Sequence, residues 1–279
     1  MSACWEPKRC LGIKPLRDKS GLTGKNLINN QAMKRLLSII LLAVAIMLPQ
    51  QLAAKGFPNE TLNYEIVYHW GMIWKHAGDA TLSLRKSGNG YKAQLTGKTR
   101  SWADKVYPVR DTLKCSMDAN LRPLVYEKLT HEKDYYARDV VKFSYNYSHT
   151  SAHCMRYRKS GTTSIDLSAK SQAYDMLSVF YMLRNLDYDE LNRNKNYTTV
   201  IFSGKEKEYL TINYKGVETI KMRDGSKRKA HRISFKFTQK GGKKSSDDLN
   251  AWMSTEADRI PLLLVGKLPV GEVKCYYKK

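Results

Sequence analysis

The sequence has few cysteines, little acidic charge, and no motif of a common enzyme class. Its 279 residues include five cysteines, eight prolines and 26 acidic residues, against 48 lysines and arginines. No CxxC pair or metal-ligand spacing occurs, which excludes the zinc-finger and thioredoxin-like classes. GxSxG, HExxH and glycine-rich phosphate loops are also missing, which excludes the enzymes built on them. The sequence therefore predicts no catalytic residue, no metal site and no cofactor.

The stretch from Met33 to Ala54 has the order of a secretory signal peptide. Two basic residues, Lys34 and Arg35, precede the apolar run Leu36–Leu48, and small residues follow it. This run is shorter than the roughly 20 residues that span a bilayer. A positive start, a short apolar run and a small-residue end are typical of a cleaved export signal. We expect cleavage after Ala54 and no transmembrane span in the mature protein.

This interpretation divides the chain into three parts. Residues 1–32 precede the signal and are polar, so we interpret them as an upstream extension that is not native to the protein. Residues 33–54 are the signal peptide, and residues 55–279 form one exported domain, which is β-rich by the strand pattern described below. A cytoplasmic tail on an uncleaved signal anchor is the alternative for the first part.

The net charge of the chain is +22, and most of it lies in residues 55–279. Such a charge favours anionic partners such as lipid headgroups or acidic glycans, or else gives a solvated basic surface. Export and the lack of a nucleic-acid motif argue against nucleic acid. Three cysteines remain after cleavage, Cys115, Cys154 and Cys275, and the sequence leaves their pairing open.

Apolar residues alternate with polar ones along most of the predicted mature chain. The alternation is clearest in Leu62–Trp70, Ala80–Leu84, Tyr91–Leu95, Val141–Tyr147 and Ile233–Phe237. Period-two alternation between turn residues predicts half-buried antiparallel strands, about a dozen here.

One segment, Ala169–Leu186, has helical spacing instead, with apolar residues that include Met176, Leu177, Phe180 and Leu183. The predicted fold is therefore mainly β within the α+β class. It is a strongly curved antiparallel sheet, or a half-open or closed β-barrel, with one amphipathic helix packed on its concave side. A two-sheet sandwich with the helix as a crossover is the alternative.

Aromatic residues are the constellation with the clearest functional meaning. In a barrel, aromatic side chains that face inward line an apolar site for one ligand, although they also fill ordinary cores. The candidates for ligand binding are Tyr68, Trp70, Trp102, Phe180 and Trp252.

Several segments, taken in order, resemble the bacterial family called domain of unknown function 3108. The residues that carry the resemblance are Tyr68-x-Trp70-Gly71, Gly78-x-Ala80, the Asp111 region and Leu121-x-Pro123, then Asp175, Ser178, Tyr181 and Arg184, and finally Trp252, Asp258-x-x-Pro261 and Gly271. The resemblance covers about residues 60–279. It implies an exported, largely β protein in the periplasm or cell envelope of a bacterium, and it supplies no catalytic residue. The implied shape is similar to that of half-barrel lipoprotein carriers, which is an analogy of fold.

Three functions compete at this point. The first is a non-catalytic binding module for a hydrophobic or lipid-like ligand. The second is a structural or assembly protein of the cell envelope that binds a protein partner through a sheet edge or an aromatic patch. The third is a hydrolase of glycans or lipids, which would need two carboxylates in one cleft. An internal cavity of roughly 300 Å³ or more would favour the first.

The export signal gives the first testable prediction. N-terminal sequencing of protein recovered from the exported fraction should find a mature start near Lys55, because the small residues Ala53 and Ala54 end the signal. A recovered chain that retains residues 1–32 would contradict this division.

Overall fold

A single sheet of fifteen strands organises the part of the chain that the structure describes. The structure is a computed structural model, and it describes residues 56–238, 244–268 and 270–279. All of them belong to the unit Leu52–Lys279. The predicted upstream extension and signal peptide lie outside the described residues.

The strands fall into two series in chain order. The first series is β1 (Glu60–Trp70), β2 (Ile73–Ser87), β3 (Gly90–Thr99), β4 (Arg110–Met117), β5 (Pro123–Glu132), β6 (Tyr135–Asn146), β7 (His149–Arg158) and β8 (Gly161–Ala169). The second is β9 (Ala173–Tyr174), β10 (Asn196–Phe202), β11 (Lys207–Lys221), β12 (Lys227–Thr238), β13 (Lys244–Ser254), β14 (Pro261–Lys267) and β15 (Glu272–Lys278). Three short helices complete the described elements: α2 (Ser101–Asp104), α3 (Ser178–Asn185) and α4 (Tyr188–Asn194).

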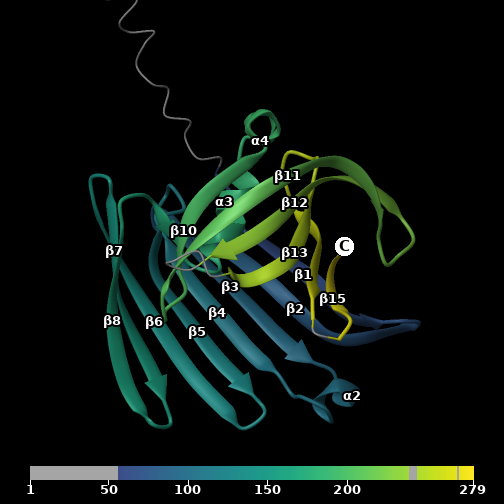
Figure 1. The fold of residues 1–279 in the computed structure, drawn as a ribbon, viewed down its shortest axis with the longest axis horizontal. Coiled ribbons are helices and arrows are strands. Elements are labelled where there is room, and N and C mark those ends of the chain that lie inside the picture. Colours follow the sequence, from purple (N-terminus) through teal and green to yellow (C-terminus); the bar gives the residue numbers. More distant parts are fainter. Residues whose placement is uncertain (1–55, 239–243, 269) are drawn as a thin grey trace, which may run out of the picture. The chain divides into compact units, whose positions relative to one another are not determined.

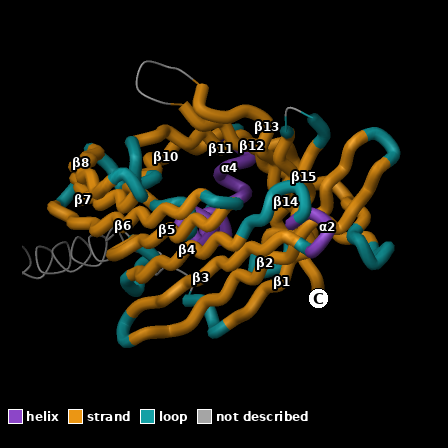
Figure 2. The backbone as a smooth tube through the Cα atoms, turned by 90° about the horizontal axis from the view of Figure 1, so that it is seen from below, coloured by secondary structure: helices purple, strands orange, loops and turns teal. Residues whose placement is uncertain are grey.

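Each series is a meander, and the pairing of β1 with β15 joins the two. The strand order runs from β8 down to β1, then from β15 down to β9, and every named pairing except that of β9 with β10 is antiparallel. Figures 1 and 2 show the first series as a broad curved sheet, with β10–β12 crossing over it and α3 and α4 between the two. This arrangement confirms the predicted curved, barrel-like sheet with a helix on its concave side.

Side-chain alternation explains which face of the sheet is buried. Leu62, Leu82, Leu95 and Leu113 are successive partners across β1 to β4, so they lie in one row on the concave face. Tight turns connect the strands, and Gly90 is required at one of them, because a Cβ there would lie 2.1 Å from the Met117 carbonyl oxygen. The inner face of the sheet is thus the main hydrophobic core.

The two ends of the sheet approach each other through side chains. Lys207 Nζ donates to the Ser168 carbonyl of β8 at 2.9 Å. Phe202 at the end of β10 stacks on Phe143 of β6 with ring centroids 5.7 Å apart. A Cβ on Gly204 would lie 3.2 Å from the Asp139 side chain. Side-chain packing and one lysine therefore hold β10 against the first meander. The strands β8 and β9 are the two edges of the sheet and do not pair with each other.

A second apolar cluster lies on the opposite face of the sheet. This outer cluster is made of Val67, Ile220, Met222, Ala230, Trp252, Leu262, Leu263 and Tyr276. Trp252, Leu263 and Tyr276 are successive cross-strand partners on β13 to β15, whereas the neighbouring row of Ala251 belongs to the inner core. The far halves of β11 and β12 supply the other side of the outer cluster. Trp252 therefore packs outside the main core.

The predicted helix is shorter than its sequence pattern. Ala169 ends β8, and Ala173–Tyr174 pairs in parallel with β10, so residues 169, 173 and 174 belong to the sheet and 170–172 form the bend between the two strands. The helix α3 begins at Ser178, because the Asp175 carboxylate accepts from the backbone N–H groups of Leu177 and Ser178 at 2.7 and 2.8 Å. The predicted range 169–186 was therefore wrong at its start.

The side chains that α3 buries also differ from those of the predicted apolar face. Leu177 and Leu183 are buried as expected, whereas Met176 and Phe180 are half-buried. The segment after α3 forms the helix α4, with Asp187 as its N-cap. Sheet on both sides of α3 buries more than one of its faces.

His231 of β12 lies in a compact polar group that sets its charge state. Arg259 Nη1 donates to His231 Nε2 at 2.5 Å, so Nδ1 carries the proton of the neutral ring and faces the Tyr214 hydroxyl at 2.9 Å. The Tyr188 ring lies 4.4 Å from the imidazole. Burial and the Arg259 charge lower the pKa of His231 from 6.5 to about 4.

This group predicts a loss of stability in mild acid. A histidine with a lowered folded-state pKa contributes stability above pH 6.5, and that contribution is lost as the pH falls toward 4. In thermal melts across this range, the wild type should lose more melting temperature than His231→Gln, which keeps both hydrogen bonds without titrating. Parallel pH profiles for the two proteins would contradict the assignment.

Candidate functional site

The concave face encloses a small apolar pocket beside α3. Its volume is about 100 Å³, and it is lined by Tyr64, Ala80, Leu82, Leu95, Phe180, Pro261, Leu264 and Cys275. The strand register brings these side chains together, because Tyr64 pairs with Ala80, Leu82 with Leu95, and Leu264 with Cys275. Phe180 closes the pocket from the helix. The pocket is smaller than the roughly 300 Å³ that would favour a binding module, so its volume alone does not select that function.

A buried ion pair fixes the helix over this pocket. The Arg184 side chain is almost fully buried, and both of its terminal nitrogens bond to the Glu60 carboxylate, with Nη2 at 3.0 Å from Oε2. Its Nε donates to the Asp258 carbonyl at 3.0 Å, and its guanidinium lies 4.5 Å from the Phe57 ring centroid. Arg184 therefore ties α3 to the start of β1 and to the turn before β14, and Phe180 lies one helical turn earlier.

A second buried polar group holds the other end of α3. Asp175 is fully buried, and its Oδ2 accepts from the Cys115 thiol at 3.0 Å, in addition to the two backbone bonds that start the helix. Burial raises the pKa of Asp175, and burial together with this carboxyl raises the pKa of the Cys115 thiol. A thiol that stays protonated is a poor nucleophile. The pair therefore acts as a structural cap.

Cys275, in the pocket wall, has the same character. Burial raises the pKa of its thiol to about 11, so it is protonated at neutral pH. All three described cysteines are free, which settles the pairing that the sequence left open.

Three tyrosine hydroxyls in the inner core have no hydrogen-bond partner among the described residues. They belong to Tyr64, Tyr126 and Tyr181, whose side chains are all buried. Burial raises the pKa of each, so each stays a neutral donor. Buried hydroxyls without partners are rare in proteins. Tyr64 stands out because its side chain also lines the pocket.

The five candidate ligand-binding residues lie in three places. Phe180 lines the pocket and Trp252 belongs to the outer cluster. The other three lie at the end of the sheet where β1 meets β2. Tyr68 donates to the Val270 carbonyl at 3.1 Å, Trp102 donates to the His76 carbonyl at 2.6 Å, and Trp70 is exposed at the hairpin tip. The structure therefore does not gather the five around one cavity.

Sequence reasoning missed the polar groups that hold the helix. Asp175 and Arg184 entered only through the family resemblance, and Cys115 only as a disulfide candidate. Their partners Glu60 and Asp258 are 124 and 74 residues from Arg184 in the chain. No local pattern signals a contact of that range.

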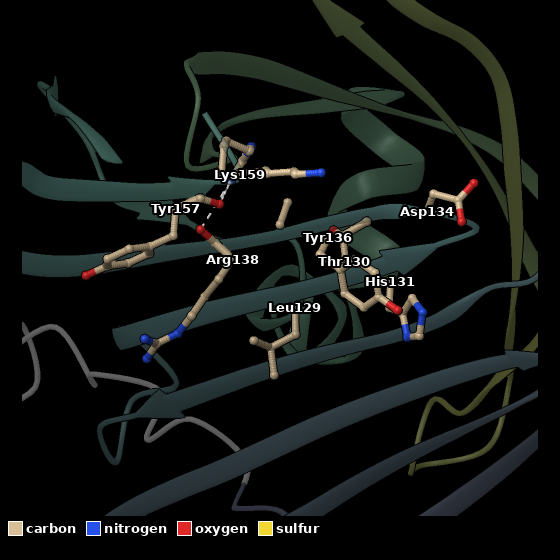
Figure 3. Close-up of a pocket in the computed structure, with 10 residues that line it drawn as sticks. Leu129, Thr130, His131, Asp134, Tyr136, Arg138, Tyr157 and Lys159 are labelled. Carbon is tan, nitrogen blue, oxygen red and sulfur yellow. Dashed lines mark hydrogen bonds between the residues drawn. The ribbon is translucent and has the colours of Figure 1, made fainter. Parts of the chain in front are cut away.

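Two larger hollows lie on the face of the first meander that points away from the core. One, of about 520 Å³, runs over β5, β6 and β7, where Leu129, Arg138 and Tyr157 are successive cross-strand partners (Figure 3). The other, of about 400 Å³, lies over β2 to β5. In the first, the His131 ring stacks on Tyr136 at 4.1 Å and Arg138 bonds to Glu127 at 2.6 Å. These contacts pair the polar groups with one another and assemble no nucleophile with a base.

The residues that the structure describes form neither a metal-binding cluster nor a membrane-spanning helix. They contain no group of three or more His, Cys, Asp or Glu side chains placed to hold a metal ion. None of the described helices is both long enough and apolar enough to cross a membrane.

The fold is similar to that of solved proteins. Three chains of known structure match, among them a beta-barrel-like protein of domain of unknown function DUF1849 from Brucella abortus. The TM-score is 0.56 at 12% sequence identity, over 79% of this chain and 96% of that chain. At this identity the likeness concerns the fold, and it agrees with the barrel-like sheet.

The sequence comparisons establish the family. No curated protein matches the chain. The family described as "Protein of unknown function (DUF3108)" matches residues 63–278, which is nearly the whole described sheet and includes α3. The chain therefore belongs to the DUF3108 family, as the order of motifs had led us to expect.

Proposed function

We propose that this protein is an exported, non-catalytic binding module for a small hydrophobic or lipid-like ligand held between the sheet and α3. The observation that carries the proposal is the apolar pocket, whose lining includes Tyr64, a buried residue whose hydroxyl has no hydrogen-bond partner among the described residues. The signal-like order of residues 33–54 supports export to the periplasm or cell envelope.

The size of the pocket limits what enters it. An apolar cavity of about 150 Å³ holds a molecule the size of benzene. A pocket of about 100 Å³ therefore takes a short alkyl segment. A longer chain requires Phe180 to turn away, and this side chain is only half-buried. Phe180 is then the residue that sets the length of chain that fits.

The Tyr64 hydroxyl defines the polar part of the ligand. Because burial keeps this hydroxyl neutral, it donates to an oxygen without placing a charge in the core. An uncharged acceptor next to an alkyl chain, such as an ester or hydroxyl oxygen, satisfies both features. The proposed class is therefore a monoacyl or alkyl compound with one uncharged polar group near the chain.

Titration with monoacylglycerols of increasing chain length tests this proposal. Phe180→Ala should extend the longest chain that binds, and Phe180→Trp should shorten it. Tyr64→Phe should weaken binding about threefold to tenfold, the value of one hydrogen bond. Tyr126→Phe is the matched control, because Tyr126 is also buried with an unpartnered hydroxyl and lies outside the pocket lining.

These variants distinguish binding in the pocket from a general loosening of the core. Equal losses in Tyr64→Phe and Tyr126→Phe would indicate general loosening of the core and would count against the pocket. Binding unchanged by both Phe180 variants would also refute it. Native mass spectrometry of protein purified from its own envelope identifies any lipid that is already bound.

A second candidate function, assembly with a protein partner, is favoured by the edge strand β8. Its residues 161–166 are exposed, and it pairs with β7 without a bulge. The strand contains no lysine or proline, the residues that usually protect an edge from further pairing. Strand addition at this edge would supply backbone hydrogen bonds to an extended partner segment.

Hydrogen exchange tests this alternative. Amides on the outer edge of β8 should exchange quickly in the isolated protein and slowly in protein isolated together with bound envelope components. The amides of β7 provide the internal control, because they already pair on both sides. Equal exchange of β8 in the two samples would rule out strand addition.

A further inference from the structure

Large apolar side chains project from the turns at one end of the sheet. The β1–β2 turn carries Trp70, Met72, Ile73 and Trp74, with Met72 98% and Trp70 53% exposed. The β14–β15 turn carries Leu268 and Val270, the latter 55% exposed. We refer to these six residues as the tip surface. Clustered exposed apolar residues on a water-soluble face mark an interaction site.

The two turns lie side by side because β1 pairs with β15. His69 is opposite Glu272 in the ladder, and Tyr68 donates to the Val270 carbonyl at 3.1 Å. A Cβ on Gly271 would lie 3.1 Å from the Trp70 side chain, so the backbones are in close contact. Figure 1 shows the dark blue β1–β2 hairpin, the yellow β14–β15 hairpin and α2 at one end of the sheet. Trp70 and Ile73 are cross-strand partners on one face of the hairpin, and Trp74, opposite His69, lies on the other face. The six side chains therefore surround the same end of the sheet.

Turn geometry does not require these residues. Gly71 alone supplies the left-handed backbone of the β1–β2 turn, with φ of +57°, and the position after it accepts any small polar residue. At the opposite end of the same strands the turns read Ser87-Gly88-Asn89 and Asp118-Ala119-Asn120, as turn chemistry favours. These two turns at the opposite end therefore carry no large apolar side chain.

Basic residues surround the tip surface. Lys274 Nζ lies 4.5 Å from the Trp74 ring centroid, and Lys75 Nζ lies 4.1 Å from that of Trp102. Segments 68–79, 98–110 and 267–274 together contain seven lysines and arginines against three acidic residues, a net charge of +4. The acids are already engaged: Glu272 bonds to His69 and Lys274, Asp79 to His76 and Arg100, and Asp104 to Arg110.

We propose that the tip surface docks on the surface of an anionic lipid bilayer, with Trp70, Met72 and Ile73 entering the interface and the lysines meeting the headgroup phosphates. Tryptophan favours the membrane interface, where its apolar ring and its N–H are both accommodated. Exposed apolar residues within a basic rim have the composition of surfaces that bind anionic membranes. This inference stands independently of the ligand pocket.

Charge complementarity selects the bilayer over a protein partner. A protein-binding hairpin would need an acidic partner surface of matching shape, whereas an anionic bilayer provides apolar depth and negative charge to any protruding turn. Met72 and Trp70 project from a tight turn, so they reach a flat surface before the rest of the sheet does.

Vesicle flotation with the full chain tests the inference, using phosphatidylcholine vesicles with and without phosphatidylglycerol. The wild type should prefer the anionic vesicles, and the preference should weaken with salt. The double variant Trp70→Ser/Met72→Ser should bind about tenfold or more weakly, because it removes two large apolar groups. Lys75→Gln and Lys105→Gln should each cost about fivefold, the worth of one lysine near such a surface.

Tyr147→Ser is the matched control, because Tyr147 is fully exposed at the opposite end of the sheet. All variants share residues 1–55, so differences between them report on the described surface. Unchanged circular dichroism and melting temperature confirm that the variants fold.

Wild-type binding by the double variant, or equal loss in Tyr147→Ser, would overturn the proposal, as would salt-independent binding to neutral vesicles. In a second readout, lipids brominated on the acyl chain should quench the wild type more than Trp70→Phe/Trp74→Phe, and equal quenching would likewise overturn it.

Discussion

The concave face of a fifteen-stranded sheet must be covered, and the rest of the structure depends on how α3 covers it. Eight residues of helix cannot bury that face by apolar contact alone, so two buried polar groups hold the helix in place. Asp175 starts the helix and accepts from Cys115 of β4. Arg184 ends it and binds Glu60 of β1. Because removing one member of a buried pair leaves an uncompensated charge, these contacts specify one position for α3 and therefore for Phe180.

The pairing of β1 with β15 has a second consequence. It places the strands that carry the pocket next to the strands whose turns form the tip surface. Tyr64 and Ala80 of the pocket lie on the same hairpin as Trp70 and Met72, and Leu264 and Cys275 lie on the same hairpin as Val270. If both proposals hold, the strands that meet the bilayer also line the ligand site. A lipid-like ligand and a membrane-facing end are then two aspects of one arrangement.

Period-two alternation predicted the sheet, because burial of one face of a strand requires an apolar residue at every second position. The same logic explains the errors. The start of α3 depends on Asp175, whose partner Cys115 is 60 residues away, and on the pairing of Ala173–Tyr174 with β10. Trp252 alternates like an inner residue, but its row faces the outer cluster that the long β11–β12 hairpin creates. The alternation pattern also could not predict that Trp70 is exposed, because it counts every aromatic residue as a core residue. Local periodicity fixes faces within a strand, and only tertiary contacts decide what covers each face.

The interior of the sheet and its hairpin end differ in how their charged groups are arranged. Inside, burial raises the pKa values of Asp175, Cys115 and Tyr64, and the Arg184 charge is matched by Glu60. At the hairpin end, the basic residues outnumber the acidic ones and the acids are already paired. The apolar pocket accepts an uncharged chain and rejects an ionised head, because burying a charge there costs more free energy than the pocket contacts return. A basic rim attracts the ionised head instead. The pocket thus selects an uncharged chain beside Phe180, and the basic hairpin end selects the anionic headgroups of a bilayer.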